Sequence, residues 1–209
     1  MDLSVLALLV PASFFVSLTP GLCMMLALSL GITVGVRQTL WMMAGELAGV
    51  ALVALAAVLG AAVLIVQYPA VFQVFKYCGG AYLAWMGVQM WHSRGQLAIL
   101  DEVGHSAARA RPSAKALMTQ GFVTAVANPK GWAFFIALLP PFINQNQPLA
   151  PQLSVLVATI LLLETLCLLI YAGGGQALSR LLERTENVRL INRVSGTLML
   201  LVGAWLALS

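Results

Sequence analysis

Two short motifs interrupt the long apolar stretches of this sequence, and both contain residue types that bind small charged molecules. Thr19-Pro20-Gly21 lies in the first apolar stretch, and Asn128-Pro129-Lys130 lies in a later one. A proline inside a helix removes a backbone donor and clashes with the preceding turn. Each motif is therefore predicted to open a helix and to free amide and carbonyl groups. Such groups persist at membrane depth only where they line a cavity.

Three charged residues within apolar stretches add acid–base chemistry. Glu46 and Glu164 are carboxylates, and Lys130 follows the second break. A charge at the bilayer centre costs at least about 2.5–3.5 kcal/mol on insertion scales, so such residues mark a functional site by default. A carboxylate held out of water binds a proton more readily, so Glu164 or Glu46 is predicted to carry protons across a membrane. A static ion pair between Glu164 and Lys130 is the structural alternative.

The composition indicates that membrane helices position these residues. The sequence is 61% hydrophobic and 9% charged, with a mean hydropathy of +0.94, which excludes a soluble domain of 209 residues. An alternating strand pattern is absent, so the predicted fold is an all-α integral membrane protein. Stretches of about 20 apolar residues predict six transmembrane helices. The predicted spans are 3–28, 40–66, 70–91, 116–143, 151–173 and 190–208.

Basic residues predict the orientation of these spans. Segments 67–70 and 144–150 contain no Lys or Arg, so the positive-inside rule places both termini outside and the basic loops in the cytoplasm. The net charge of +4 then reflects topology, and its spread over several loops argues against nucleic-acid binding. The basic residues after spans one, three and five are Arg37, Arg94, Arg109, Arg111, Lys115, Arg180, Arg184, Arg189 and Arg193.

The chain also has the features of an internal duplication. Residues 80–87 of span three match 196–203 of span six, with glycines seven residues apart in both. A repeat of three spans crosses the membrane an odd number of times, so its second copy is inverted. We therefore predict two inverted three-helix repeats with broken helices one and four. The first repeat is 1–92, the cytoplasmic linker loop is 93–115, and the second repeat is 116–209.

Several stretches, together with the two breaks, are similar to a known family. The sequence resembles the LysE/RhtB family of bacterial amino-acid exporters. The resemblance implies a multi-pass, six-helix exporter of the bacterial inner membrane that expels amino acids or related small metabolites and uses the proton gradient. We further predict alternating access around the breaks at Pro20 and Pro129, with neutral or small polar substrates favoured over cationic ones. Leu22 and Cys23 depart from the family pattern after Gly21, which affects substrate identity more than fold. The matching stretches are 15–21, 81–87, 121–135, 140–143, the span with Glu164 and Tyr171, and 196–203.

An amino acid presents a carboxylate and an ammonium group, so its site needs a positive helix end or cation and an acceptor. The carboxylate is predicted to meet Thr19, Pro20 and Gly21 of the first break and Asn128, Pro129 and Lys130 of the second. Glu164 or Glu46 is predicted to face the ammonium group or a proton. No cofactor, metal site or catalytic residue is expected, because His92 and His105 have no metal-ligand pattern and no paired nucleophile.

Two other membrane functions are alternatives. A thiol-disulfide electron carrier would use Cys23 beside Pro20, but no cysteine accompanies Pro129, so the exchanging pair is missing. A channel or an ion exporter of the same architecture is the second alternative, although acidic, His and Cys clusters for a metal ion are scarce. Glycine-rich helix faces favour a homodimer, with a monomer as the alternative.

Overall fold

A computed structural model of the chain describes residues 3–92, 112–139, 142–144, 147–183 and 185–208. These residues form helices joined by short connections, with no strand among them, which confirms the predicted all-α class. The predicted linker 93–115 lies mostly outside the described residues, and a helix already begins at Ala114. The helices are α1 (Leu3–Leu18), α2 (Leu22–Thr33), α3 (Val36–Gln67), α4 (Pro69–His92), α6 (Ala114–Ala127), α7 (Pro129–Leu138), α8 (Leu149–Glu183) and α9 (Thr185–Leu208).

Long apolar helices make this a membrane protein. Within the described residues, α3 over Val36–Gly60 and α8 over Leu149–Gly175 are each long and apolar enough to cross a bilayer. A third span is obtained if α1 and α2 are counted together as one bent helix. Large apolar side chains also cover the outside of the molecule, as expected where the surroundings are lipid. Exposed examples are Leu52, Leu59, Leu162, Leu190 and Leu201.

Both proline motifs interrupt helices at the predicted positions. α1 ends at Leu18 and α2 begins at Leu22, with a bend of 54° between them. α6 ends at Ala127 and α7 begins at Pro129, with Asn128 between the two. Pro129 occupies the first turn of α7, where a missing backbone donor does no harm.

The helices do not all begin and end where the predicted spans do. The apolar segment of α8, Leu149–Gly175, agrees closely with the predicted span 151–173, although the helix itself is longer. α8 continues past the predicted end at 173 to Glu183, and α9 begins at Thr185 rather than 190. Within α8, Gly175 has φ 45° and ψ −134°, a left-handed conformation that favours glycine and redirects the helix. α7 ends at Leu138, before the predicted 143, because a proline pair follows at 140–141.

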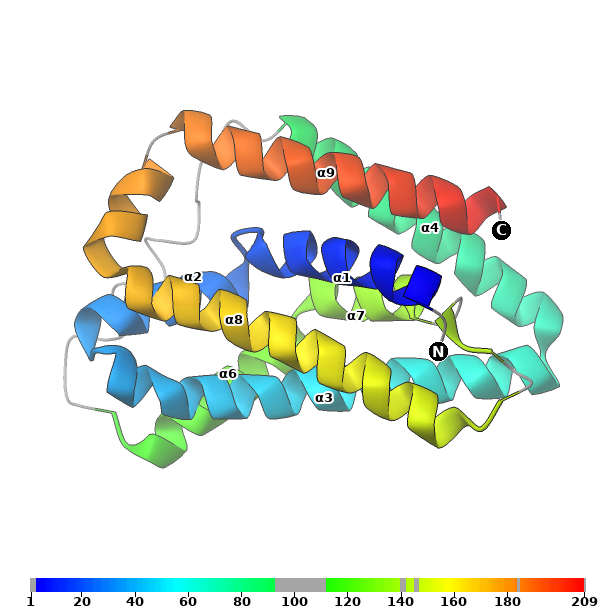
Figure 1. Ribbon diagram of the computed structural model, residues 1–209, viewed down its shortest axis with the longest axis horizontal. Helices are drawn as coiled ribbons and strands as arrows, with labels where there is room; N and C mark the ends of the chain where they lie inside the picture. The colour runs from blue at the N-terminus through cyan, green and yellow to red at the C-terminus, as the bar shows by residue number, and fades with distance from the viewer. Residues whose placement is uncertain (1–2, 93–111, 140–141, 145–146, 184, 209) are drawn as a thin grey trace.

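Glycine contacts hold two pairs of helices at close range, and Figure 1 shows these pairs on opposite sides of the molecule. In the pair α3 and α6, a Cβ at Gly45 would lie 1.9 Å from the Met118 carbonyl oxygen. In the pair α4 and α9, Gly87 meets Gly196, and Gly203 meets Gly80. Glycine therefore allows backbone-to-backbone packing that any larger residue would prevent.

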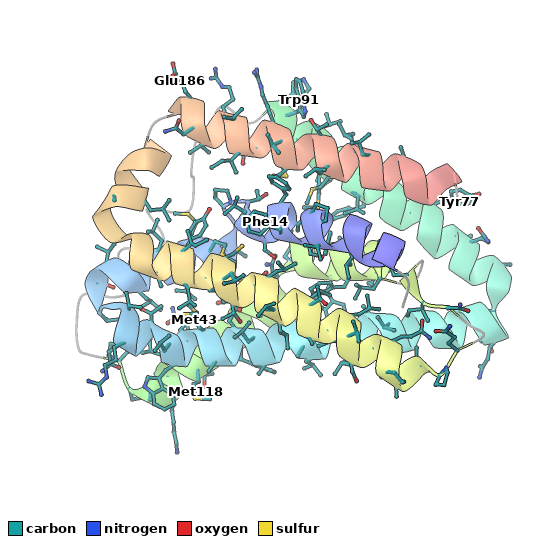
Figure 2. The ribbon with its side chains drawn as sticks, viewed as in Figure 1. Phe14, Met43, Tyr77, Trp91, Met118 and Glu186 are labelled. Atoms are coloured by element: carbon teal, nitrogen blue, oxygen red, sulfur yellow. The ribbon has the colours of Figure 1, made fainter. Side chains whose placement is uncertain are left out.

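Helices α1, α2, α7 and α8 fill the space between these two pairs (Figure 1). Their buried side chains form two apolar clusters, one of which includes Met43 of α3 (Figure 2). Figure 2 also shows Met118 of α6 pointing away from the helices, in keeping with its exposed side chain. The two breaks thus lie between these helix pairs, where the freed backbone groups are shielded from lipid.

Candidate functional site

One cavity lies against both helix breaks. It has about 60 Å³ of space for the centres of water-sized molecules, which corresponds to on the order of five waters. Its wall contains both polar and apolar side chains. The lining residues are Ser13, Val16, Ser17, Thr19, Gly21, Cys23, Met24, Glu46, Val50, Val53, Ala125, Asn128, Lys130, Gly131, Phe134, Phe135, Ile160 and Glu164.

The structure brings most of the predicted site residues to this cavity. Thr19 and Gly21 from the first break, and Asn128 and Lys130 from the second, all line it. Both predicted carboxylates, Glu46 and Glu164, line it as well. The two prolines, Pro20 and Pro129, are not among the lining residues. Their effect is on the backbone, since they end one helix and start the next.

Lys130 reaches from α7 to the end of α1. Its ammonium group donates hydrogen bonds to the carbonyl oxygens of Val16, at 2.6 Å, and Thr19, at 3.3 Å. The last carbonyls of a helix have no partner within the helix, and a cation is favoured at that end. Among the described residues no ion pair joins Lys130 to Glu164, so the lysine holds backbone oxygens rather than a carboxylate.

Side chains from other helices satisfy the remaining groups at the end of α1. The Thr19 hydroxyl donates to the Phe15 carbonyl oxygen at 2.7 Å and contacts the Ser195 Oγ at 2.5 Å. The Tyr171 hydroxyl of α8 donates to the Leu18 carbonyl oxygen at 2.8 Å. α8 and α9 therefore fix the first break in place.

Asn128 serves both halves of the second break. Its backbone ends α6, and its Oδ1 accepts a hydrogen bond of 3.1 Å from the backbone amide of Lys130 at the start of α7. An asparagine is among the best residues for this capping position. Its Nδ2 points to the Sγ of Cys23 at 3.7 Å, which links the second break to α2 across the cavity.

The start of α2 has no such cap. Gly21 occupies the capping position with an extended backbone and makes no side-chain cap hydrogen bond. The first amides of a helix have no partner within the helix and carry its positive dipole end. Gly21, Cys23 and Met24 line the cavity, so this end of α2 is suited to an anionic group.

The two carboxylates are in different states of hydrogen bonding. Glu164 of α8 accepts a hydrogen bond from the Ser17 hydroxyl of α1. Glu46 of α3 is 0% exposed, and neither of its oxygens has a hydrogen-bond partner. Ser13 of α1 is 2% exposed, and its hydroxyl also has no partner. The sequence analysis treated the carboxylates as alternatives, whereas the structure distinguishes them by their surroundings.

Sequence reasoning missed several polar residues of this site. Ser13, Ser17 and Ser195 are ordinary serines in apolar stretches, and Tyr171 was noted only as part of a stretch similar to the family. Ser13 and Ser17 lie four residues apart and therefore on the same face of α1. That spacing was the only sequence feature that could have indicated these two residues.

No group of His, Cys, Asp and Glu able to hold a metal ion occurs in the part of the chain that the structure describes.

The three cysteines are all free. Cys23 and Cys167 are buried, whereas Cys78 is exposed. Cys23 has the amide of Asn128 beside it at the second break. This arrangement offers no thiol partner to Cys23 within the cavity.

Comparison with known proteins places the chain in a family. The sequence profile of the family described as LysE type translocator matches residues 14–209. A homoserine/homoserine lactone efflux protein of Salmonella typhimurium strain LT2 is 28% identical over 195 residues, which cover 93% of this chain and 92% of the relative. A leucine efflux protein of Klebsiella pneumoniae is 32% identical over 132 residues, covering 63% of this chain and 60% of the relative.

An uncharacterized membrane protein of Vibrio cholerae is 29% identical over 208 residues, covering 99% of this chain and 98% of the relative. No solved structure is significantly similar to the chain. Because the family profile extends from α1 to the end of the sequence, this protein belongs to the family of LysE type translocators.

Proposed function

We propose that the protein exports amino acids from the bacterial cytoplasm across the inner membrane, coupled to proton movement. Two relatives carry names that describe efflux of homoserine, homoserine lactone or leucine. The observation that carries the proposal is a cavity that meets both helix breaks and is lined by Glu46, Glu164 and Lys130. Helix breaks of this kind form the substrate sites of many secondary transporters. The proposed role is transport and not catalysis.

The cavity has a place for each part of an amino acid. The uncapped start of α2, with Lys130 close to Gly21, is the proposed carboxylate end. The carboxylates of Glu46 and Glu164 are the proposed end for an ammonium group or a proton. Side chains of Val50, Val53 and Ile160 form an apolar wall for the substrate's side chain.

The size of the cavity favours a small substrate. Space for on the order of five waters is close to the volume of a compact amino acid and leaves little room for a long side chain. The buried ammonium of Lys130 disfavours a second cation nearby. Neutral or small polar amino acids are therefore the proposed substrates, in preference to cationic ones.

The proposed mechanism is alternating access between two inverted three-helix repeats, 1–92 and 116–209, with the linker 93–115 between them. The glycine contacts between α4 and α9 support it. The sequence match pairs Gly80 with Gly196 and Gly87 with Gly203, and in space Gly87 meets Gly196 while Gly203 meets Gly80. If each glycine is replaced by its match in the other repeat, the contact between Gly87 and Gly196 becomes the contact between Gly203 and Gly80. A two-fold relation between the repeats requires this equivalence.

Transport in proteoliposomes tests the proposal. The protein is reconstituted, and uptake of labelled homoserine, leucine and lysine is measured with and without an imposed pH gradient. We expect gradient-dependent accumulation of a neutral amino acid, which the double variant Glu46→Gln/Glu164→Gln abolishes and Glu186→Gln leaves unchanged. Glu186 is a suitable control because its side chain projects from the start of α9 (Figure 2).

Other results would select the alternatives. Uptake that equilibrates without accumulation under every gradient would indicate a channel. Transport of an inorganic ion in place of amino acids would indicate an ion exporter. Loss of function on replacing Cys23, together with electron transfer to a thiol acceptor, would indicate the electron carrier.

A further inference from the structure

Two polar side chains in the cavity have no hydrogen-bond partner. They are the Glu46 carboxylate of α3 and the Ser13 hydroxyl of α1, which are 0% and 2% exposed. Both line the cavity. A buried polar group without a partner is destabilising, and a buried charge much more so. These two groups therefore have binding capacity that the folded protein itself does not use.

The other polar side chains of the cavity are already engaged. Glu164 accepts from Ser17, and Lys130 donates to two carbonyl oxygens. Thr19 bonds to Phe15 and Ser195, while Asn128 caps α7. A ligand that enters the cavity consequently finds acceptors at Glu46 and Ser13 without breaking a hydrogen bond of the protein.

The charges around Glu46 favour a cationic ligand group. The titratable groups that face it are Glu164 of α8 and Cys23 of α2, and neither is positive. Lys130 of α7 interacts with Glu164 and is bound to the end of α1. Two carboxylates and one ammonium group leave one negative charge to balance inside the cavity, which a proton or a cationic group must supply.

We infer that Glu46, assisted by Ser13, binds the ammonium group of the transported molecule, and that a proton competes with this ammonium group for the Glu46 carboxylate. The inference rests on the proposed export function and assigns different roles to the two carboxylates. An ammonium group has three donors, which the two Glu46 oxygens and the Ser13 Oγ can accept. Glu164, held by Ser17, contributes negative charge without being the ammonium ligand.

This competition supplies a physical basis for exchange. A protonated Glu46 has lost its charge and cannot attract the ammonium group, so proton uptake from one side expels the substrate. The protonated site then returns to the cytoplasmic side, where it releases the proton before the next ammonium group binds. Each turnover then moves a proton inward and an amine outward.

Binding to the full-length protein in lipid nanodiscs tests the inference. The probes are L-leucine and L-homoserine, with N-acetyl-L-leucine, which lacks the ammonium group, and L-leucine methyl ester, which lacks the carboxylate. Affinities are measured by calorimetry between pH 5 and pH 8. We expect the N-acetyl compound to bind the wild type about tenfold to a hundredfold more weakly than L-leucine, because it loses a charged hydrogen bond. The methyl ester keeps the ammonium group and should therefore keep the pH dependence of binding.

Two variants identify the residues. Glu46→Gln is expected to weaken binding of the amines by about tenfold to a hundredfold and to make their affinity independent of pH. Ser13→Ala is expected to weaken it by about threefold to tenfold and to keep the pH dependence, because a neutral hydrogen bond is lost. In the wild type, amine affinity falls as the pH is lowered, since the proton occupies the same carboxylate. Glu164→Gln should retain that fall.

Exposed residues provide matched controls. Glu186→Gln and Ser154→Ala change the same side chains outside the cavity and should leave the affinities at wild-type values. Glu46→Gln replaces a buried carboxylate by a neutral amide and is expected to fold at least as well, which thermal unfolding in the nanodiscs verifies. Glu46→Asp, with the charge withdrawn by one methylene, is a second variant that keeps the pH dependence but binds more weakly.

The outcomes separate this inference from the proposed function. If the wild type transports and binds amines but Glu46→Gln leaves affinity and pH profile unchanged, the ammonium subsite is elsewhere and only the inference is wrong. Equal binding of the N-acetyl compound and L-leucine would also overturn it. If the wild type neither binds nor transports any of these amines, the proposed function fails and the inference fails with it.

Discussion

Lys130 stabilises the end of α1 at the first break. Its ammonium group supplies donors to two carbonyl oxygens that α1 leaves without helical partners. It comes from the second break, so one side chain ties the two interrupted helices together. The transport role proposed for Lys130 and its structural role are thus linked, and they have to be separated by measuring stability and transport on the same variants.

Replacing Lys130 with alanine should lower both properties. Lys130→Ala leaves the carbonyl oxygens of Val16 and Thr19 without their donor, and each such loss costs about 1–3 kcal/mol. We expect a lower unfolding temperature in detergent and no accumulation of amino acids in proteoliposomes. Lys115→Ala is the control, because that lysine is exposed near the start of α6. A Lys130→Ala protein as stable as the wild type would show that these hydrogen bonds contribute little.

At the second break, the stability of the connection between α6 and α7 depends on how the helix ends are capped. Asn128 ends α6 and caps α7 with its side chain, so the connection needs only one residue. Asn128→Ala should destabilise the protein by about 1 kcal/mol because α7 loses its cap, whereas Asn128→Ser should keep most of the stability, since serine caps helices well. Chemical unfolding of both variants distinguishes these outcomes. Equal stability of the two would indicate that the cap is not needed.

Close packing between helices depends on individual glycines. A Cβ at Gly45 would lie 1.9 Å from the Met118 carbonyl oxygen, so Gly45→Ala must push α3 and α6 apart. We expect a loss of about 1–3 kcal/mol or more, measured by thermal unfolding. Gly60 lies in the same helix with nothing within 4 Å of an added Cβ. Gly60→Ala should therefore be neutral or gain up to about 1 kcal/mol, and a loss there as large as at Gly45 would contradict the packing argument.

At the scale of the whole molecule, the helices run between two ends. Figure 1 shows the start of α1, the end of α9 and the start of α8 at one end, with the start of α6 at the other. Basic residues are absent from 144–150, before α8, and present before α6 at Arg109 and Arg111. This arrangement agrees with the proposed orientation, in which both termini face the periplasm.

Labelling of introduced cysteines tests this orientation. In a variant without Cys23, Cys78 and Cys167, either Gln147→Cys or Ser113→Cys is added, because both positions are exposed. We expect a membrane-impermeant maleimide to label the Gln147→Cys variant in intact cells. The Ser113→Cys variant should react only after permeabilisation. The reverse pattern would place the termini in the cytoplasm.

The sequence by itself determined the helical class and the two breaks. Both follow from local physics: a bilayer requires long apolar segments whose backbone bonds are made internally, and a proline interrupts such a segment wherever it stands. The charged residues were also recognisable in the sequence, because an ionisable group in an apolar stretch is unusual. The structure places Glu46, Glu164 and Lys130 at one cavity, and their roles there stay predictions.

The tertiary structure alone decided which partner each of these residues has. Ser17 and Glu164 lie 147 positions apart, and Thr19 and Ser195 lie 176 positions apart, so no local pattern announces either contact. Packing also directed Lys130 to carbonyl oxygens instead of a carboxylate and left Glu46 and Ser13 without partners. Hydrogen bonds between helices depend on how the helices rotate and cross in three dimensions, and hydropathy along the chain carries no information on that.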